Sequence, residues 1–447
     1  MTIKTRRIFF YSLIFIFALA GAYLIASAQG WVLDIKNFRI VKTGSLFLKY
    51  IPSNATVSIN GETTDASPGI LTGGTLISRL VPGEYEIKIS ETGYRPWEKN
   101  LKVREALVTS ASQIKLWPED NKLINVSTSS ISDFWLTGAG AVLQLKDKTL
   151  NLGDSVLRGR QVILTEPNFS SLISSDGKNY FLSDLGDPKN PVNLSSLFAS
   201  LVQNSTSSSP VETPIKFFFH PFSNGKIIVI AKNSAYSLDL KRNVLNKIIS
   251  AKNIIASAAS DNEIFIEDAK GNLYSYNLFL QTAGSYDGKF PVNASLKASP
   301  GGSFLFFLKD NGELIKYDRA QKTSETLSKS AENFFISPDE KRIIISTKDN
   351  RLSMGALSDY YADGDVKKGD VWAIPSGNGE LNDFEWLPDS PNYGLVLSGE
   401  KLSLTELDSR IPQNNYPVAD GVKKLFVQGE NIYILKTNGT LSEVSLK

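Results

Sequence analysis

The feature of this chain that most constrains its fold is a unit of about 40 residues that recurs along residues 119–447. Each unit holds an apolar strand, a turn, a second apolar strand, a short polar turn and an alternating strand. The second turn marks the period, and it falls at Asn233, Gly271, Gly312, Asn350, Gly399 and Gly439. Four-stranded units of this kind bury little surface alone and must stack around an axis. The repeat therefore predicts an all-β fold whose larger part is a β-propeller of seven or eight blades.

The last unit predicts how the ring closes. Residues 425–447 carry apolar residues at strand-like positions. Unpaired strands there would expose an open sheet edge, whereas a propeller joins its first and last blades. We therefore expect residues 429–446 to pack beside the first unit, residues 124–152, where the two could share one blade.

An apolar segment near the amino terminus predicts the location of the chain. Residues 8–28 are uncharged and, as a helix, would span about 30 Å, the thickness of a bilayer's hydrocarbon core. Lys4, Arg6 and Arg7 precede this segment, and the positive-inside rule keeps such a tail, residues 1–7, in the cytoplasm. We expect a single-pass protein of the cell membrane with an extracytoplasmic body.

The alternative interpretation of the apolar segment is a cleaved signal peptide. Ala26-Ser27-Ala28 provides the small residues that a signal peptidase accepts. The segment is longer than the roughly 7 to 15 residues of a signal peptide's apolar core, which favours a retained anchor. Residues 29–42, which follow, are interpreted as a juxtamembrane linker, and in both cases the body lies outside the cytoplasm.

Residues 43–117 show the alternation of half-buried strands joined by tight turns. Four blocks stand out in order: Pro52-Ser53-Asn54-Ala55, Val57-Ser58-Ile59-Asn60-Gly61, Leu80-Val81-Pro82-Gly83-Glu84-Tyr85 and Gly93-Tyr94-Arg95-Pro96-Trp97. With these blocks the segment resembles the PEGA domain, a small β-sandwich-like module of surface-layer and other envelope proteins. The resemblance implies an interaction or spacer module rather than a catalyst.

Tyr94 and Trp97 are the candidate ligand-contact residues of this module. Following the turn at Gly93, they could form an exposed aromatic patch that stacks on a sugar or a peptide. The alternative is that both aromatic rings close the core of the sandwich, as large aromatic residues commonly do. The sequence leaves both interpretations open.

A turn phrase within the repeat carries a second resemblance. Ser337-Pro338-Asp339-Glu340-Lys341 resembles the Ser-Pro-Asp-Gly-Lys turn of TolB-like propellers. Ser299-Pro300-Gly301-Gly302 and Leu387-Pro388-Asp389-Ser390 echo it in two other units. The resemblance implies the propeller architecture and says much less about function.

Two segments look like connections. Residues 117–120, Trp-Pro-Glu-Asp, read as a short linker, so we expect the module of residues 43–117 and the propeller of residues 119–447 to be stable independently of each other. Residues 199–214 are rich in serine and are interpreted as a polar loop between two units.

The composition argues against several classes of function. The net charge is +2 with Lys and Arg scattered along the chain, so nucleic acid is not an expected partner. There is no cysteine and only one histidine, His220, which argues against structural zinc, thiol catalysis and a His-dependent triad. His220 occupies a turn position of the repeat and is interpreted as structural. We expect no cofactor and no resident metal.

Residues 359–370 form an insertion in the sixth unit that is dense in oxygen ligands. The segment could hold Ca²⁺, but it lacks the regular spacing and the bidentate Glu of a calcium loop. Lys367 and Lys368 also partly neutralise it. A solvated polar hairpin is the favoured interpretation.

Two hypotheses for the function follow. The first is a non-catalytic, membrane-anchored envelope protein that presents the propeller as a binding or scaffold surface, with the PEGA-like module as a spacer or wall contact. Its expected partners are a cell-wall polymer, a surface glycan or an envelope protein. The alternative is a carbohydrate-active enzyme with carboxylates clustered at the propeller channel, whose pKa values would be strongly shifted.

Overall fold

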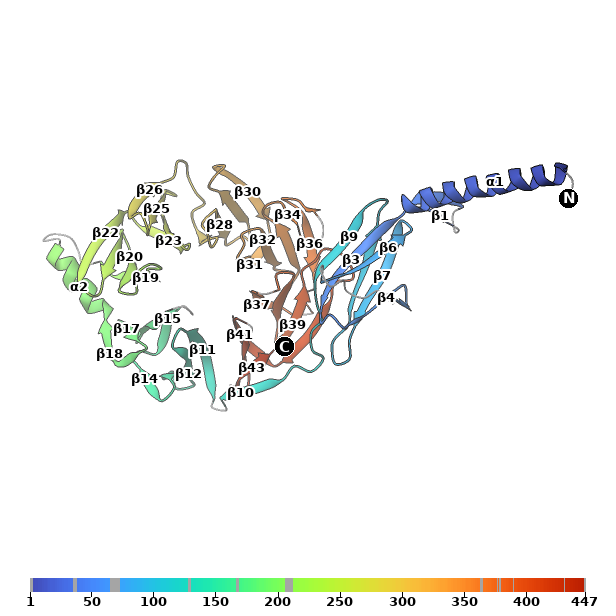
Figure 1. Ribbon diagram of the computed structural model, residues 1–447. Coiled ribbons are helices and arrows are strands. Elements are labelled where there is room, and N and C mark those ends of the chain that lie inside the picture. Colours follow the sequence, from blue (N-terminus) through green and yellow to red (C-terminus); the bar gives the residue numbers. More distant parts are fainter. Residues whose placement is uncertain are drawn as a thin grey trace.

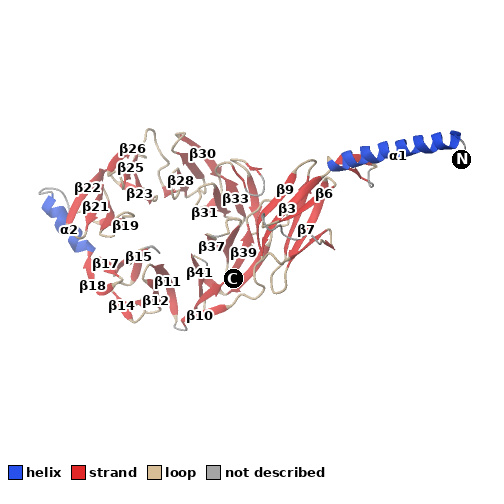
Figure 2. Cartoon of the chain, viewed as in Figure 1, coloured by secondary structure: helices blue, strands red, loops and turns tan. Residues whose placement is uncertain are grey.

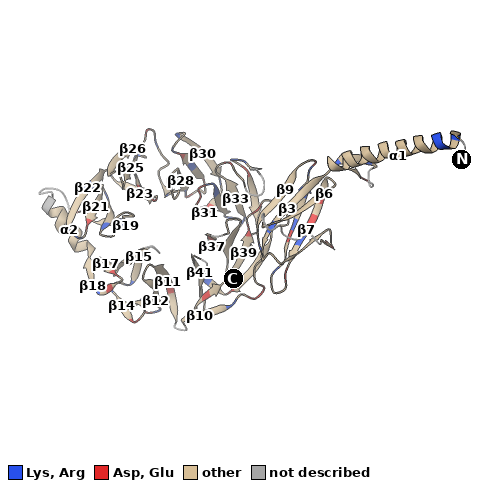
Figure 3. Ribbon diagram, viewed as in Figure 1, with Lys and Arg blue, Asp and Glu red and all other residues tan. Residues whose placement is uncertain are grey.

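One long helix separates the amino terminus from a body that consists almost entirely of β-strands, as the computed structural model shows (Figures 1 and 2). The structure describes residues 3–34, 38–64, 73–127, 130–165, 169–205, 212–361, 365–375, 377, 379–388, 390–429 and 431–445. Helix α1 spans Ile3–Ala28, and its described side chains are not buried by the rest of the chain. Basic residues lie at its start (Figure 3), and its length and composition suffice to cross a bilayer.

A β-hairpin follows α1 where the sequence predicted a juxtamembrane linker. Strand β1 (Trp31–Asp34) pairs antiparallel with β2 (Arg39–Lys42). The backbone amide of Thr43 donates a hydrogen bond to the carbonyl oxygen of Gly30 at 2.7 Å. The hairpin is therefore closed at its base by the residues that join it to the helix and to the body.

The next module is a sandwich of two sheets, formed by residues 44–115. The first sheet has the order β6-β3-β9 and contains β3 (Gly44–Ile51), β6 (Thr75–Leu80) and β9 (Val108–Lys115). The second has the order β5-β4-β7-β8 and contains β4 (Thr56–Ile59), β5 (Glu62–Thr63), β7 (Gly83–Ser90) and β8 (Trp97–Val103). Strands β3 and β9 are parallel, and the other pairs are antiparallel.

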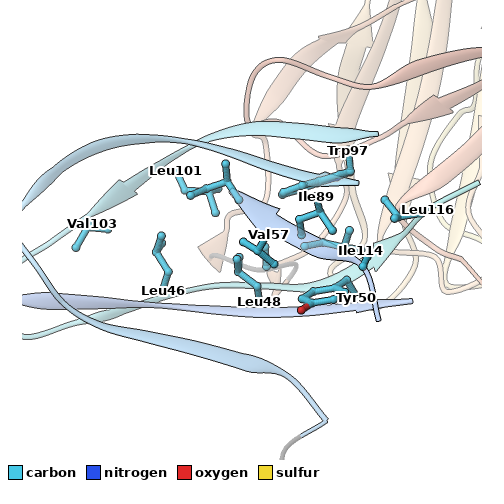
Figure 4. Close-up of a cluster of buried hydrophobic side chains, with 13 residues drawn as sticks. Leu46, Leu48, Tyr50, Val57, Ile89, Trp97, Leu101, Val103, Ile114 and Leu116 are labelled. Atoms are coloured by element: carbon cyan, nitrogen blue, oxygen red, sulfur yellow. The ribbon is translucent and has the colours of Figure 1, made fainter. Parts of the chain in front are cut away.

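The core of this module lies between the two sheets (Figure 4). Leu46 and Leu48 of β3 point inward from one sheet, and Ile89 and Leu101 point inward from the other. All four side chains are fully buried. This packing follows from the two-residue period of the strands, which sends alternate apolar side chains to one face.

Eight four-stranded antiparallel sheets follow in the described part of the chain beyond residue 122. The first four contain β11 (Ile131–Thr137), β12 (Gly140–Leu145), β13 (Leu150–Leu152) and β14 (Ser155–Leu157); β15 (Gln161–Thr165), β16 (Ser171–Ser175), β17 (Tyr180–Asp184) and β18 (Asp187–Asn193); β19 (Pro214–Phe219), β20 (Lys226–Ala231), β21 (Ser234–Asp239) and β22 (Val244–Ser250); β23 (Ile254–Ala259), β24 (Glu263–Asp268), β25 (Leu273–Asn277) and β26 (Thr282–Ser285).

The remaining four sheets complete the ring (Figure 1). They contain β27 (Ala294–Ala298), β28 (Phe304–Lys309), β29 (Leu314–Asp318) and β30 (Thr323–Ser328); β31 (Ala331–Ile336), β32 (Arg342–Thr347), β33 (Leu352–Ala356) and β36 (Val371–Ile374); β37 (Leu381–Trp386), β38 (Tyr393–Ser398), β39 (Lys401–Glu406) and β40 (Asn415–Asp420); β10 (Leu123–Ser127), β43 (Leu441–Ser445), β42 (Asn431–Lys436) and β41 (Val422–Gln428).

Buried apolar side chains join each of these sheets to its neighbour around the whole ring. Phe134 of β11 shares a cluster with Leu435 of β42, so the first sheet packs on the sheet that contains the carboxyl-terminal strands. Leu395 of β38 and Ile432 of β42 share the cluster on that sheet's other side. The sheets therefore form a closed β-propeller.

The closing sheet combines both ends of the propeller. Strand β10 pairs with β43, and Leu123 lies opposite Val444. Strands β41 and β42 complete this sheet. The prediction that the last strands pack beside the first unit and share a sheet with it is confirmed.

One segment differs from the sequence-based expectation. Residues 199–205, predicted as part of a polar loop, lie in helix α2 (Leu194–Ser205). Leu194, Phe198 and Val202 recur every four residues and are buried against the neighbouring sheets, which holds this Ser-rich segment in a helix. Residues 206–211 of the predicted loop lie outside the described residues.

Deleting residues 437–447 should lower the free energy of unfolding of the propeller by several kcal/mol. The deletion removes β43, the strand between β10 and β42, together with the buried side chains of Leu441 and Val444. Strand pairing and apolar burial are then lost together. Denaturant unfolding monitored by circular dichroism measures the change.

Two single substitutions in the same strand pair provide a matched comparison. Leu441 is fully buried, so Leu441→Ala should cost about 2–5 kcal/mol. Leu123 on β10 is 39% exposed, so Leu123→Ala should cost less than about 1 kcal/mol. An unchanged melting temperature after the deletion would favour an open array over a closed ring.

Candidate functional site

The small module meets the propeller along the free edge of β8. This strand is the last of its sheet, so its outer backbone groups face away from the module. The Asn100 amide donates a hydrogen bond to the Ile411 carbonyl oxygen at 3.0 Å, and the Glu98 amide donates to Asn414 Oδ1 at 3.2 Å. The segment between β39 and β40 therefore covers this edge.

A buried ion pair lies at the centre of this interface. Lys99 Nζ lies 2.8 Å from Glu406 Oε2 and donates to the carbonyl oxygen of Arg410 at 2.9 Å. Lys99 is 0% exposed and Glu406 is 3% exposed. Asn414 Nδ2 also donates to Glu406 Oε2, at 2.7 Å, and Asp408 lies 3.8 Å from the ammonium. Two charges so deeply desolvated are stable only when both are present and hydrogen-bonded.

Trp97, one of the two predicted ligand-contact residues, belongs to this interface and to the sandwich core. It is 1% exposed, and its Nε1 donates to Glu406 Oε1 at 3.0 Å. Trp97 is therefore not available to stack on a ligand, and the structure corrects that hypothesis in favour of the core interpretation. Tyr94 is half-buried and packs against the same core, while its backbone bridges to Pro118.

The segment that joins the two modules, residues 117–120, is buried at its first residue and exposed at Glu119 and Asp120. Trp117 is 2% exposed and packs edge-to-face on Tyr393 of the propeller, with 5.3 Å between the ring centroids. Its carbonyl oxygen accepts a hydrogen bond from the Arg95 amide at 2.8 Å. Together with the Lys99–Glu406 pair, this packing argues against the expectation that the modules are stable independently.

Charged side chains also gather on the innermost strands of the ring. Strands β11, β15, β19, β23, β27, β31, β37 and β41 each end a sheet on the side that faces the centre (Figure 1). We use the name inner rim for six charged residues of these strands: Asp133, Lys216, Lys297, Asp383, Glu385 and Lys424. The hydrogen bonds of its three lysines connect neighbouring sheets.

Lys424 connects the two sheets that meet where the ring closes. Its Nζ donates to Asp133 Oδ1 and to the carbonyl oxygen of Phe134, both at 2.7 Å. The ammonium also lies 4.6 Å from the centroid of the Trp135 ring. The cation is therefore held by a carboxylate, a carbonyl and an aromatic face.

Asp383 and Glu385 lie on one face of β37, opposite the buried ring of Phe384. Burial, with the nearby charge of Asp383, raises the pKa of Glu385 to about 7. Burial also raises the pKa of Asp383, although the amide of Phe384 and the charge of Lys424 oppose that rise. Glu385 can therefore hold or release a proton near neutral pH.

Lys216 and Lys297 connect other sheets in the same way as Lys424. Lys216 Nζ donates to the carbonyl oxygen of Ser257 at 2.7 Å, and Lys297 Nζ donates to that of Phe334 at 3.4 Å. Desolvation lowers the pKa of both amines. The inner rim thus presents cations and carboxylates around one axis, which suits a polar ligand.

His220 sits in the turn between β19 and β20. Its Nδ1 accepts a hydrogen bond from the Phe222 amide at 3.3 Å, and burial lowers the pKa of the imidazole. The side chain is 7% exposed. Its contacts are those of a turn, in line with its position in the repeat.

The described part of the insertion, residues 359–361 and 365–370, contains a short hairpin of β34 (Tyr360–Tyr361) and β35 (Asp365–Val366). Asp359 accepts a hydrogen bond from the Lys368 amide at 2.8 Å and lies 3.4 Å from Lys367 Nζ. Both lysines of the insertion therefore contact the Asp359 carboxylate. Residues 362–364 lie outside the described residues.

The ion pair of the interface was missed by the sequence reasoning, although the sequence contains a signal for it. Trp97, Leu101 and Val103 alternate as core residues of β8, and Lys99 occupies the same face. Glu406 likewise continues the buried face of Leu402 and Leu404 on β39. A charged residue at a core position of a strand predicts a buried partner of opposite charge. Its position in the sequence does not indicate which residue that partner is.

The geometry defines a β-propeller that is fused to a small β-sandwich through a buried interface. The PEGA domain family model matches residues 43–118. The small module is therefore a PEGA domain, as its four sequence blocks predict. We name it so from here on.

The search of solved structures returns many chains. BamB from Moraxella catarrhalis has a TM-score of 0.44 and 12% identity, covering 72% of this chain and 100% of that chain. TolB from Acinetobacter baumannii has a TM-score of 0.30 and 13% identity, covering 60% and 59%. Kluyveromyces lactis Hsv2p has a TM-score of 0.43 and 9% identity, covering 65% and 99%. No curated protein sequence matches significantly.

Replacing Lys99 with Met should lower the free energy of unfolding by about 3–5 kcal/mol, because Glu406 would remain buried without its cation. The double variant Lys99→Met/Glu406→Gln should recover part of this loss, because the unpaired charge is then absent. Denaturant unfolding of the single and double variants gives the coupling energy between the two side chains.

Lys88→Met is the matched control. Lys88 lies 2.7 Å from Glu98 on the adjacent strand, but its side chain is 47% exposed. Loss of this surface pair should cost less than about 1 kcal/mol. Equal losses for Lys88→Met and Lys99→Met would contradict the structural role of the buried pair.

Replacing Glu385 with Gln should remove part of the pH dependence of stability. Between the unfolded-state pKa near 4.5 and the folded-state pKa of about 7, the folded protein holds a proton that the unfolded chain releases. The free energy of unfolding of the native protein therefore falls as pH rises through this window and levels off above it. Glu385→Gln should be more stable than the native protein at about pH 8, by on the order of 3 kcal/mol, and equal to it near pH 4.

Glu267→Gln is the control for this titration. Glu267 on β24 is fully buried, and burial raises its pKa to about 7 as well. Glu267→Gln should also raise the free energy of unfolding at about pH 8, and it leaves the residues of the inner rim unchanged. Parallel stability curves for the native protein and Glu385→Gln would show that the pKa of Glu385 is not raised.

Proposed function

We propose that this chain is a membrane-anchored extracytoplasmic envelope protein that presents its β-propeller as a binding or scaffold surface. In this proposal α1 is the anchor and the PEGA domain is a rigid spacer or wall contact. The observation that carries it is the buried interface around Lys99 and Glu406, which fixes one orientation of the propeller on the PEGA domain. A fixed orientation next to an anchor is the property that a presenting surface needs.

The inner rim is the surface proposed to bind the partner. Its lysines and carboxylates lie around one axis, and the amines of Lys216 and Lys297 already donate to carbonyl oxygens. Such amines can instead donate hydrogen bonds to the hydroxyl or carboxylate groups of a bound polymer. A cell-wall polymer, a surface glycan or the polar face of an envelope protein is the proposed partner. In this first proposal the inner rim binds its partner without reacting with it.

A carbohydrate-active enzyme remains the second candidate function, and the pair Asp383 and Glu385 favours it. A carboxyl with a pKa of about 7 is suited to act as a general acid near neutral pH. If this function is correct, Glu385→Gln should abolish hydrolysis of a polysaccharide that the native protein cleaves. Release of reducing ends measures the reaction, and no release by the native protein removes this candidate.

The double variant Lys216→Gln/Lys297→Gln should lose binding to the partner. The test incubates the full chain in nanodiscs with cell-wall polymer, surface glycan and envelope extract, and compares the captured material. The matched control, Lys241→Gln/Lys322→Gln, removes the same charge from exposed outer turns of the same two sheets. Equal capture by both double variants would exclude the inner rim, and no capture by the native protein would contradict the binding function.

Protease treatment of intact cells tests the membrane topology on which this proposal rests. The region beyond Trp31 should be degraded, because Lys4, Arg6 and Arg7 are expected to hold the amino terminus in the cytoplasm. Lysed cells provide the control for protease access. Protection of the whole body in intact cells would overturn the topology.

A further inference from the structure

The β1–β2 hairpin after the anchor helix has an apolar face that is exposed. The register pairs Leu33 with Ile40 and Trp31 with Lys42, so these four side chains share one face of the hairpin. Trp31 is 40% exposed, Leu33 is 56% exposed and Ile40 is 69% exposed. Phe38, just before β2, is 85% exposed. A surface hairpin in water normally shows the opposite arrangement.

The other face of the hairpin is turned toward the body and carries charge. Val41 is 4% exposed and Asp34 is 5% exposed. The Asp34 carboxylate lies 3.5 Å from Arg39 Nε. Asp34 is also close enough to Tyr85 of β7 that its charge helps burial to raise the pKa of that phenol. The Asp34 carboxylate therefore faces the protein, while Trp31, Leu33 and Ile40 face outward and Arg39 lies exposed at the edge of the hairpin.

The position of the hairpin indicates what covers its apolar face. The apolar part of α1 ends at Ala28, and three residues reach at most about 11 Å, so Trp31 lies close to the end of the helix. The headgroup layer on each side of a bilayer is roughly 5–8 Å thick. If α1 spans a bilayer, the hairpin lies at headgroup depth, and the Gly30–Thr43 hydrogen bond holds its base there.

We propose that the exposed face of the β1–β2 hairpin inserts into the lipid headgroup layer of the membrane that α1 crosses. Trp31 lies at the depth that indole rings prefer, and Leu33, Phe38 and Ile40 reach the boundary of the acyl chains. Arg39, whose side chain is 61% exposed, meets lipid phosphates at the hairpin's edge. The inference rests on the proposed anchor role of α1.

This contact gives the body a second attachment to the membrane. A helix alone allows the body to rotate and tilt about the single connection. Asp34 of the hairpin is buried close to Tyr85 of the PEGA domain, and the PEGA domain contacts the propeller through Lys99. Insertion of the hairpin therefore sets the angle at which the propeller stands above the bilayer.

Quenching of tryptophan fluorescence tests the contact. The full chain is reconstituted into phosphatidylcholine vesicles with or without brominated acyl chains, and Trp31→Phe is compared with the native protein. We expect the brominated lipid to quench a fraction of the native emission that is missing in Trp31→Phe. The same fraction should be shielded from iodide in the aqueous phase.

A second variant separates loss of insertion from loss of folding. Leu33→Ser/Ile40→Ser should shift the emission of Trp31 to the red and make it accessible to iodide, with an unchanged circular dichroism spectrum. The control is Ile51→Ser, which changes an equally apolar side chain, 63% exposed, at the far end of β3, about 23 Å away along the strand. This control should leave the quenching as in the native protein.

The outcomes distinguish this inference from the proposed function. Equal quenching of the native protein and Trp31→Phe by brominated lipid, with the chain still sedimenting with the vesicles, overturns the hairpin contact and leaves the anchor intact. Iodide access to Trp31 in the native protein overturns it as well. Failure of the chain to sediment with vesicles contradicts the anchor role of α1 itself.

Discussion

The structure depends first on the requirement that each propeller sheet be covered on both faces. A single four-stranded sheet with apolar residues on both sides, such as the one that contains Phe265 and Ile266, would be insoluble alone. In a closed ring every sheet is covered on both faces by its two neighbours. An open ring would leave the outer faces of its two end sheets uncovered. Closure brings β10 and β43 into one sheet, so the most distant parts of the propeller sequence stabilise the whole. The inner rim exists because this arrangement turns one strand of every sheet toward a common axis.

The interface between the PEGA domain and the propeller depends on the pairing of polar groups, whereas the propeller sheets are joined by apolar packing. An unpaired sheet edge and an unpaired buried charge are both unfavourable. Strand β8 has both features, because its backbone forms a sheet edge and its Lys99 side chain is buried. The segment after β39 supplies the backbone carbonyl and the Asn414 side chain, and Glu406, the last residue of β39, supplies the carboxylate. Groups that must be paired select one arrangement and exclude others, which an apolar contact alone does less well. The PEGA domain and the propeller therefore share a buried interface in which these polar groups are paired.

Much of the fold could be predicted from the sequence, because strand alternation and the repeat period are local patterns. They predict the sandwich, the propeller and the closing sheet, and the apolar run predicts α1. The features that escaped prediction depend on groups brought together from distant positions, as with Lys99 and Glu406. The hairpin was missed because Trp31, Leu33 and Ile40 are apolar yet lie on its exposed face. For the candidate site, the enzyme hypothesis expects clustered carboxylates with strongly shifted pKa values at the channel, without naming them. Only the structure shows that Asp383, Glu385 and Lys424 lie on neighbouring inner strands.

The pairing of β10 with β43 also has a consequence for folding during synthesis of the chain. Asn125 and Ser442, which share a hydrogen bond across this pair, are 317 residues apart in the chain. β10 leaves the ribosome early and has no partner in its sheet until β43 has been synthesised. During that interval its exposed edge is open to pairing with other chains. Biosynthesis of this protein thus contains a long waiting period, in which a chaperone that covers strand edges would increase the yield of folded molecules.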